Sequence, residues 1–236
     1  MEYLKIKQGK NQLRANGTPY AIPLFITKNR KYGKVTSEQA ISVKRPILVT
    51  GAHDSGKTRW LIRMHEKSQA IWGSKIKADA LYLDTLSPLS AWIDAPALAQ
   101  WWDQQNPDTP WQKLKQHDRA EALPDYCEDT RAVLFIDDAH KLAGRKLQLA
   151  RQCVMASKIF VISASEEQRL PPNLRSVVMR RKPQIFRLDS EVAYDATKII
   201  MWMVIAACIA AGFWEGAAVL GGLQALGSGR RSSRAD

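Results

Sequence analysis

The sequence GAHDSGKT at residues 51–58, directly after the apolar run PILVT, constrains the fold more than any other feature of the chain. It matches the pattern GxxxxGK[ST], whose glycines let backbone N–H groups converge on a phosphate at the positive end of a helix. Because short patterns recur by chance, the match needs a strand before it and a helix after it. The β-branched run ILVT and the helix-compatible TRWLIRMH supply both. The stretch therefore predicts a phosphate-binding loop.

Each fixed position of this loop has a chemical task. Gly51, Ser55 and Gly56 belong to the part that would surround the phosphate. Lys57 would reach the β- and γ-phosphates, and the hydroxyl of Thr58 would bind Mg²⁺. The loop predicts ATP and Mg²⁺ as the ligands of this chain.

A second motif, AVLFIDDAH at residues 132–140, ends an apolar run with two acids. Carboxylates at the carboxyl end of a strand lie where α/β sheets bind their ligands. Asp137 would hold Mg²⁺ through water, and Asp138 would orient or deprotonate an attacking water. Taken alone, the pair of acids is also compatible with a helix N-cap. Its place about eighty residues after the phosphate loop favours the Walker B interpretation.

Five short apolar runs alternate with helical stretches after residue 45, which predicts an α/β P-loop NTPase with a five-stranded, mainly parallel sheet sandwiched by helices. The expected strands are 46–51, 80–85, 132–137, 159–164 and 184–189. The expected helices are 58–73, 95–105, 110–123, 140–156 and a short one near 166–178. The tryptophans between residues 86 and 131 are typical of packing rather than of base stacking.

Basic residues are concentrated in two segments of a chain whose formal net charge is +12. Residues 1–45 carry ten lysines and arginines against two acids, and residues 169–187 add six arginines and lysines. Such segments suit nucleic acid or anionic lipid headgroups, or reflect the positive-inside bias of a membrane protein. The three cysteines show no pair spacing, which favours a reducing compartment without a disulfide framework.

Residues 199–226 form an apolar block with one ionisable group, Glu215. As a helix this block would be long enough to cross a bilayer, and a soluble helix is rarely apolar on all sides. We expect a C-terminal membrane helix, or alternatively a hairpin turning near residues 212–216 that returns the basic tail to the cytoplasm. The predicted division is a basic lead-in (1–45), an ATPase domain (46–190), a membrane segment (199–226) and a basic tail (227–236).

The motifs GAHDSGKT, VLFIDDAH and IFVISAS, followed by LPPNLRSVV, together resemble the core of AAA+-type P-loop ATPases over about residues 46–189. They are most similar to the branch with Asp-Glu-Ala-His at Walker B, found in secretion-associated and transposition-helper ATPases. The resemblance implies a sensor residue at Ser163 or Ser165 that contacts the γ-phosphate or water. It also implies a homo-oligomer in which an arginine reaches the nucleotide of a neighbouring subunit. Arg175 is the nearest match, with Arg180 and Arg181 as substitutes.

The sequence departs from that family at two points. Asp138 stands where the family has a catalytic glutamate, and the helical lid expected after the last strand is missing. A P-loop core followed directly by a membrane segment is similar in layout to the zonula-occludens-toxin-like assembly ATPases of filamentous phages. That similarity implies an inner-membrane location and partners in a membrane complex, although the phosphate loop of those proteins lies almost at the N-terminus.

Three functions remain open from the sequence. The first is a membrane-anchored ATPase, with its ATPase domain in the cytoplasm, that powers assembly or transport of DNA or protein at the inner membrane. The second is a nucleotide-dependent membrane scaffold with little turnover, which the shorter Asp138 and the missing lid favour. The third function, a metabolite kinase, is less favoured because nothing in the sequence resembles an acceptor pocket.

Overall fold

The computed structural model describes residues 2–13, 19–28, 34–73, 80–188, 203–204 and 210–212. The chain divides into two compact units, Met1–Ser190 and Glu191–Asp236. The predicted membrane segment and basic tail fall in the second unit, almost wholly outside the described residues. Among the residues that the structure describes, no helix is long and apolar enough to cross a membrane. The membrane helix or hairpin therefore stays a prediction.

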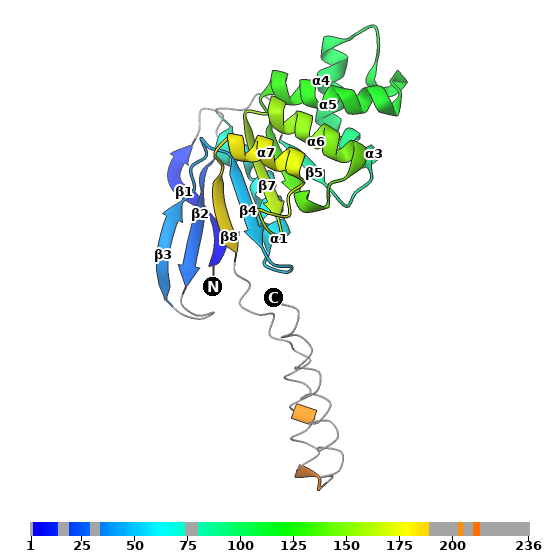
Figure 1. Ribbon diagram of the computed structural model, residues 1–236. Helices are drawn as coiled ribbons and strands as arrows, with labels where there is room; N and C mark the ends of the chain where they lie inside the picture. Colours follow the sequence, from blue (N-terminus) through cyan, green and yellow to red (C-terminus); the bar gives the residue numbers. More distant parts are fainter. Residues whose placement is uncertain are drawn as a thin grey trace. The chain divides into compact units, whose positions relative to one another are not determined.

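The first unit is built on a five-stranded parallel sheet (Figure 1). Its strands are β4 (Ile47–Gly51), β5 (Leu81–Asp84), β6 (Val133–Asp137), β7 (Ile159–Ala164) and β8 (Gln184–Leu188). Every one coincides with a predicted apolar run, and all neighbouring pairs are parallel. The predicted α/β fold with a five-stranded parallel sheet between helices is confirmed.

The strand order β5-β6-β7-β4-β8 inserts β7 between the phosphate-loop strand and the strand of the FIDDAH motif. In register, Leu48 and Ile136 both lie opposite Ile162, on the two sides of β7. Because the strands are parallel, their carboxyl ends meet at one edge of the sheet. The phosphate loop, Asp137 and the end of β7 are thereby brought together.

Helices cover both faces of the parallel sheet, which explains why its three inner strands, β4, β6 and β7, are apolar without alternation. On β6, Leu134 and Ile136 face a cluster built with α3, α5, α6 and α7, whereas Val133 and Phe135 face α1 and α2. The helices are α1 (Lys57–Glu66), α2 (Ser68–Trp72), α3 (Leu89–Ile93), α4 (Pro96–Gln105), α5 (Gln116–Thr130), α6 (Gly144–Ala156) and α7 (Pro172–Arg180), with short 3₁₀ turns η1 (Trp111–Lys113) and η2 (Ala139–Lys141).

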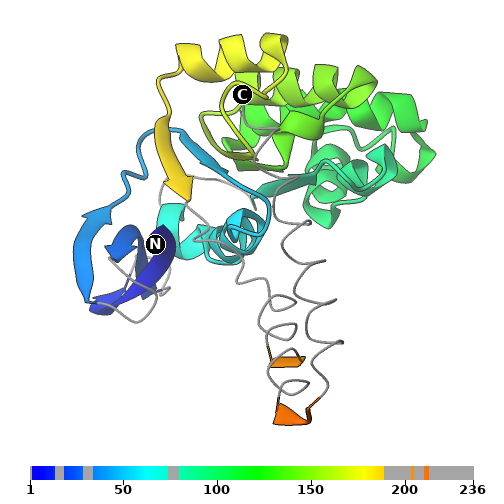
Figure 2. The same cartoon turned by 60° about the horizontal axis from the view of Figure 1, so that its bottom comes forward.

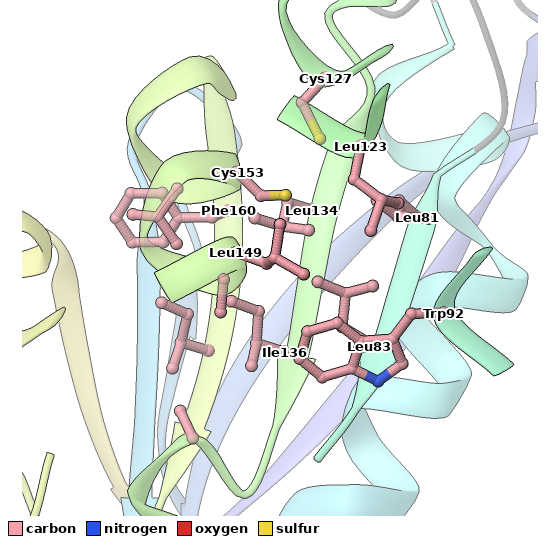
Figure 3. Close-up of a cluster of buried hydrophobic side chains, with 14 of the residues drawn as sticks. Leu81, Leu83, Trp92, Leu123, Cys127, Leu134, Ile136, Leu149, Cys153 and Phe160 are labelled. Atoms are coloured by element: carbon pink, nitrogen blue, oxygen red, sulfur yellow. The ribbon is translucent and has the colours of Figure 1, made fainter. Parts of the chain in front are cut away.

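Figure 3 shows the first of these two clusters, in which Leu149 and Cys153 of α6 lie over Phe160 and the β6 side chains. Cys127 of α5 and Cys153 are both buried and free. A hydrogen bond with Cys127, together with burial, raises the pKa of the Cys153 thiol well above its usual value. The Cys153 thiol therefore stays neutral, and both buried cysteines serve as apolar packing groups.

The tryptophan-rich connection after β5 also packs on this cluster. Trp92 and Trp111 are buried, and Trp101 and Trp102 pack partly buried against the same residues. The Trp92 indole donates a hydrogen bond to the carbonyl of Asp84, at 2.7 Å, which fixes α3 to the end of β5. These side chains are thus part of the core.

The N-terminal strands β1 (Glu2–Leu13), β2 (Pro19–Lys28) and β3 (Val35–Ala40) form a separate antiparallel sheet in the order β1-β2-β3. Figure 2 shows this sheet, in blue, beside α1, in cyan. Leu4, Ala21 and Ile41 join the cluster under α1, and the rings of Phe25 and Phe186 lie 5.1 Å apart. The two sheets therefore share one hydrophobic cluster within the first unit.

Four expected helices have different limits in the structure. The stretch 58–73 forms two helices, α1 and α2, and the short helix near 166–178 is α7, Pro172–Arg180. The helix expected over 110–123 is replaced by η1 and by α5, which continues through Pro124 because Tyr126 and Cys127 beyond it are buried. The helix expected over 140–156 begins at Gly144. Gly144, the first residue of this helix, has a φ angle of 55°, so the chain changes direction where α6 begins.

Leu149→Ala should lower the free energy of unfolding by about 2–5 kcal/mol, because it empties a fully buried site between α6 and the sheet. Met155 lies on the same helix but is 55% exposed, so Met155→Ala should change the free energy of unfolding by less than about 0.5 kcal/mol. Urea denaturation of both variants measures the difference. Equal losses would contradict the described packing of α6.

Candidate functional site

The candidate site lies at the carboxyl edge of the parallel sheet, where the loop of residues 51–56 joins β4 to α1. The backbone N–H of Gly51 donates to the carbonyl of Ser165, at 3.1 Å, which ties the start of this loop to the end of β7. The loop thus begins at a fixed place and ends at the N-terminus of a helix. That geometry presents unpaired N–H groups and a positive dipole to an anion.

The two glycines of the motif are required for different reasons. A Cβ on Gly51 would lie 2.5 Å from the carbonyl oxygen of Leu188 and 2.7 Å from Ser55 Oγ. Gly56 has open space around it but adopts a φ of 85°, a left-handed conformation that costs other residues energy. Gly51 therefore permits close approach of β8, and Gly56 permits the turn into α1.

Lys57 is buried in the loop, with 7% of its surface exposed. Its ammonium donates to the carbonyls of Gly51 and Ala52, at 2.8 and 2.7 Å, and lies 3.4 Å from Ser55 Oγ. Burial lowers the pKa of Lys57, and the nearby carboxylates of Asp138 and Asp137 oppose that shift. A cation held among loop carbonyls is placed to bind an anion that enters the loop.

Asp137, at the end of β6, is 5% exposed and is held by hydrogen bonds on both carboxylate oxygens. Ser163 Oγ of β7 donates to Asp137 Oδ1, and the hydroxyl of Tyr82 on β5 donates to Oδ2 at 3.3 Å. Burial, reinforced by Asp137, raises the pKa of the Tyr82 hydroxyl, so it remains a donor. The carboxylate is therefore fixed in orientation by the strands on both sides of β6.

Asp138 follows in a left-handed conformation, with its backbone N–H donating to Ser163 Oγ at 2.8 Å. Its carboxylate forms an ion pair with Lys141, whose Nζ lies 2.6 Å from Asp138 Oδ2. Ser163 thus contacts both acids, because it donates to the first and accepts from the second.

Ser165 lies just beyond β7, and its backbone N–H donates to Nδ1 of His140 at 3.3 Å. Burial lowers the pKa of His140, so this ring is neutral at pH 7. Ser165 Oγ is buried and has no hydrogen-bond partner among the described residues. It is therefore an unsatisfied polar group at the edge of the site, of the kind that a bound ligand or water satisfies.

A cavity of about 800 Å³ opens beside the phosphate loop, lined by that loop, η2, the segment after β7, α7 and the end of β8. Five basic side chains line it against three acidic ones. The lining residues are Thr50, Gly51, Ala52, His53, Lys57, Asp138, His140, Lys141, Ser165, Glu166, Glu167, Gln168, Arg169, Arg175, Arg187 and Leu188. The cavity therefore suits an anionic ligand.

The predicted Mg²⁺ residues fit a small hard cation by their chemistry. A second cavity, also about 800 Å³, contains Thr58, Lys57 and Asp138 on the α1 side of the loop. Thr58 offers a hydroxyl, and Asp137 offers the oxygen that Tyr82 contacts. No group of three acids, histidines or cysteines able to hold a metal occurs among the described residues. Mg²⁺ needs none, since it is held by one or two protein oxygens, waters and phosphates.

The three arginines suggested for action between subunits lie in different surroundings. Arg175 lines the cavity of its own chain, with Nη2 3.6 Å from Glu167 Oε1. Arg181 donates to the carbonyls of Val154 and Lys158, at 3.0 and 3.2 Å, and so caps the end of α6. Arg180 is exposed. A role for any of them in a neighbouring subunit stays a prediction.

Sequence reasoning missed four side chains of this site. His140 and Lys141 directly follow the FIDDA stretch, so their place in the motif was a signal that could have been used. Tyr82 gave no such signal, because only the pairing of β5 with β6 places it beside Asp137. Arg187 enters the cavity for a similar reason, through the register of β8 with β4.

No protein-family model matches the chain, and no curated protein sequence matches it either. Among solved structures, Cdc6p from Pyrobaculum aerophilum is 18% identical, with a TM-score of 0.38 over 61% of this chain and 38% of its own. AMPPCP-bound DnaA from Aquifex aeolicus is 12% identical, with a TM-score of 0.35 over 62% of this chain and 41% of its own. A point variant of RuvB from Thermotoga maritima is 18% identical, with a TM-score of 0.35 over 66% of this chain and 41% of its own.

The chain spans less than half the length of each of these three structures. Identities and TM-scores this low do not establish a shared family. The assignment of the site rests on its own geometry instead, that is, on a glycine loop and buried lysine opposite two carboxylates.

Gly51→Ala should lower the free energy of unfolding by about 1–3 kcal/mol, because its methyl group would collide with the backbone of β8. Gly56→Ala should cost about 1 kcal/mol, since it introduces only left-handed strain. Denaturant titration of both variants gives the comparison. A loss for Gly51→Ala that does not exceed that for Gly56→Ala would contradict the close approach of β8.

Proposed function

We propose that this chain binds ATP with Mg²⁺ and hydrolyses it, in the manner of an AAA+-type P-loop ATPase. The observation that carries the proposal is the meeting of Lys57, Asp137 and Asp138 at one sheet edge, with β7 between their two strands. The loop N–H groups and Lys57 would bind the phosphates. Thr58 and, through water, Asp137 would hold Mg²⁺, which supplies charge neutralisation of the phosphates when bound.

Hydrolysis would use Asp138 as the group that receives a proton. A water molecule attacks the γ-phosphorus, the bond from that phosphorus to the β–γ bridging oxygen breaks, and ADP and phosphate leave. The water's proton passes to the Asp138 carboxylate and then to solvent. Ser163 supports this role by holding the backbone N–H of Asp138 and the carboxylate of Asp137 together.

The second candidate is a nucleotide-dependent scaffold with little turnover. The ion pair between Asp138 and Lys141 favours it, because the carboxylate oxygen that contacts the ammonium is already engaged and is not directed at a water molecule. Asp138 is also shorter than the glutamate of the resembled family. In this function ATP binding sets the oligomeric state, and hydrolysis is incidental.

The finer function follows from the sequence. Residues 199–226 support anchoring at a bacterial inner membrane with the nucleotide site in the cytoplasm. The basic residues of 1–45 and 169–187 suit DNA, or the headgroups of that membrane. We place the protein in a homo-oligomeric membrane complex that assembles or moves DNA or protein.

Lys57→Ala should weaken binding of ATP and ADP by at least about tenfold, because it removes a charged phosphate ligand. Asp138→Asn should keep nucleotide binding and lower turnover by about 10²–10⁴-fold, since it removes the proton acceptor. Phosphate release and equilibrium binding of a fluorescent nucleotide measure the two effects. Asp54→Asn, which changes an exposed acid in the same loop, is the matched control.

The outcomes separate the two candidates. Turnover in the parent protein that is lost in both variants excludes the scaffold. A parent that binds ATP and changes its sedimentation without releasing phosphate excludes the ATPase. If neither ATP nor ADP binds, both candidate functions are excluded.

Deleting residues 191–236 should move the protein from the membrane fraction to the soluble fraction of expressing cells, because the apolar block is lost. Flotation of cell lysates on a density gradient measures the distribution, and the ATP affinity of the shortened protein reports its integrity. A full chain that stays at the bottom of the gradient would contradict the membrane location.

A further inference from the structure

Lys141 has no assigned role, yet it makes the closest contact of the proposed proton acceptor. Asp138 and Lys141 lie at the two ends of one 3₁₀ turn, closed by the Lys141 N–H donating to the Asp138 carbonyl at 2.8 Å. Across this turn the ammonium lies 2.6 Å from Asp138 Oδ2. The pair is partly solvated, with side-chain exposures of 39% for Lys141 and 20% for Asp138. Because water reaches this pair, its net stabilisation is small enough for the ammonium to exchange partners.

Lys141 also belongs to the cavity beside the phosphate loop. It lines the same cavity as Gly51 and Lys57. Its positive charge contributes to lowering the pKa of both Lys57 and His140, which places it within electrostatic reach of the loop lysine. Two ammonium groups therefore share this cavity, with the Asp138 carboxylate beside one of them.

The strand order decides which phosphate Lys141 can reach. The loop after β4 surrounds the inner phosphates, while Lys141 belongs to the segment after β6. With β7 between them, the two strands are about 10 Å apart. A nucleotide seated in the loop would approach Asp138 and Lys141 with the end of its phosphate chain. ADP, one phosphate shorter, would leave the ion pair undisturbed.

We propose that Lys141 distinguishes ATP from ADP: its ammonium exchanges the Asp138 carboxylate for the terminal phosphate of bound ATP. The exchange frees Asp138 to accept a hydrogen bond from the attacking water. ADP binding leaves Asp138 paired, so the proton acceptor becomes available only when a third phosphate is present. This inference rests on the proposed nucleotide site, and it also explains how an ion-paired carboxylate can act in hydrolysis.

The test compares the affinities of the full-length protein for Mg²⁺·AMPPNP, a non-hydrolysable triphosphate, and for Mg²⁺·ADP. Lys141→Gln should weaken AMPPNP binding by about tenfold, the value of one charge-assisted hydrogen bond, and change ADP affinity by less than about twofold. Asp138→Asn should strengthen AMPPNP binding by about threefold or more, because Lys141 no longer has to leave a carboxylate. Lys113→Gln, the same change at an exposed lysine of η1, should alter neither affinity.

Isothermal titration calorimetry gives the affinities, and thermal denaturation shows whether each variant is folded. An unchanged ratio of AMPPNP to ADP affinity in Lys141→Gln would overturn the inference, whether both affinities stay the same or both fall by the same factor. If the parent protein binds both ligands through Lys57 and Lys141→Gln changes neither affinity, this inference is wrong but the proposed function is not. A parent that binds neither overturns the proposed function itself.

Discussion

The hydrogen bond from Ser163 to the Asp137 carboxylate is the interaction on which the site depends. Asp137 is almost fully buried, and an ionised carboxylate without partners would be costly there. Ser163 can supply this bond only because β7 lies directly beside β6. The same hydroxyl accepts from the N–H of Asp138, so one buried side chain orients both acids. The strand order and the chemistry of the site are therefore linked.

The backbone around this bond is specialised for the site rather than for the core. Gly56 and Asp138 both adopt left-handed conformations, one at the entrance to α1 and the other after β6. In each case the chain leaves a regular strand and turns across the carboxyl edge before helix begins. Such strained positions concentrate where ligands bind. A further positive φ angle, 55° at Gly144, marks the start of α6, later than its sequence pattern indicates.

The fold could be predicted well from the sequence, and the site only in part. Continuous apolar runs such as IFVISA identify buried parallel strands, and the glycine and lysine pattern locates the loop. Tyr82 and Arg187 could not be found, because their proximity to the site follows from strand order and register. Helix limits failed where tertiary packing outweighed local signals, as at Pro124, or where a positive φ angle interrupted the pattern, as at Gly144.

The central claim is that the loop of residues 51–58 binds the phosphates of a nucleotide with Asp138 and Lys141 at their outer end. A crystal structure of the full chain with Mg²⁺ and AMPPNP tests it most directly. We predict the triphosphate on the loop N–H groups and Lys57, with Lys141 turned from Asp138 to the terminal phosphate. A nucleotide bound elsewhere would contradict the claim, and so would a loop that remains closed on Lys57 at saturating ligand.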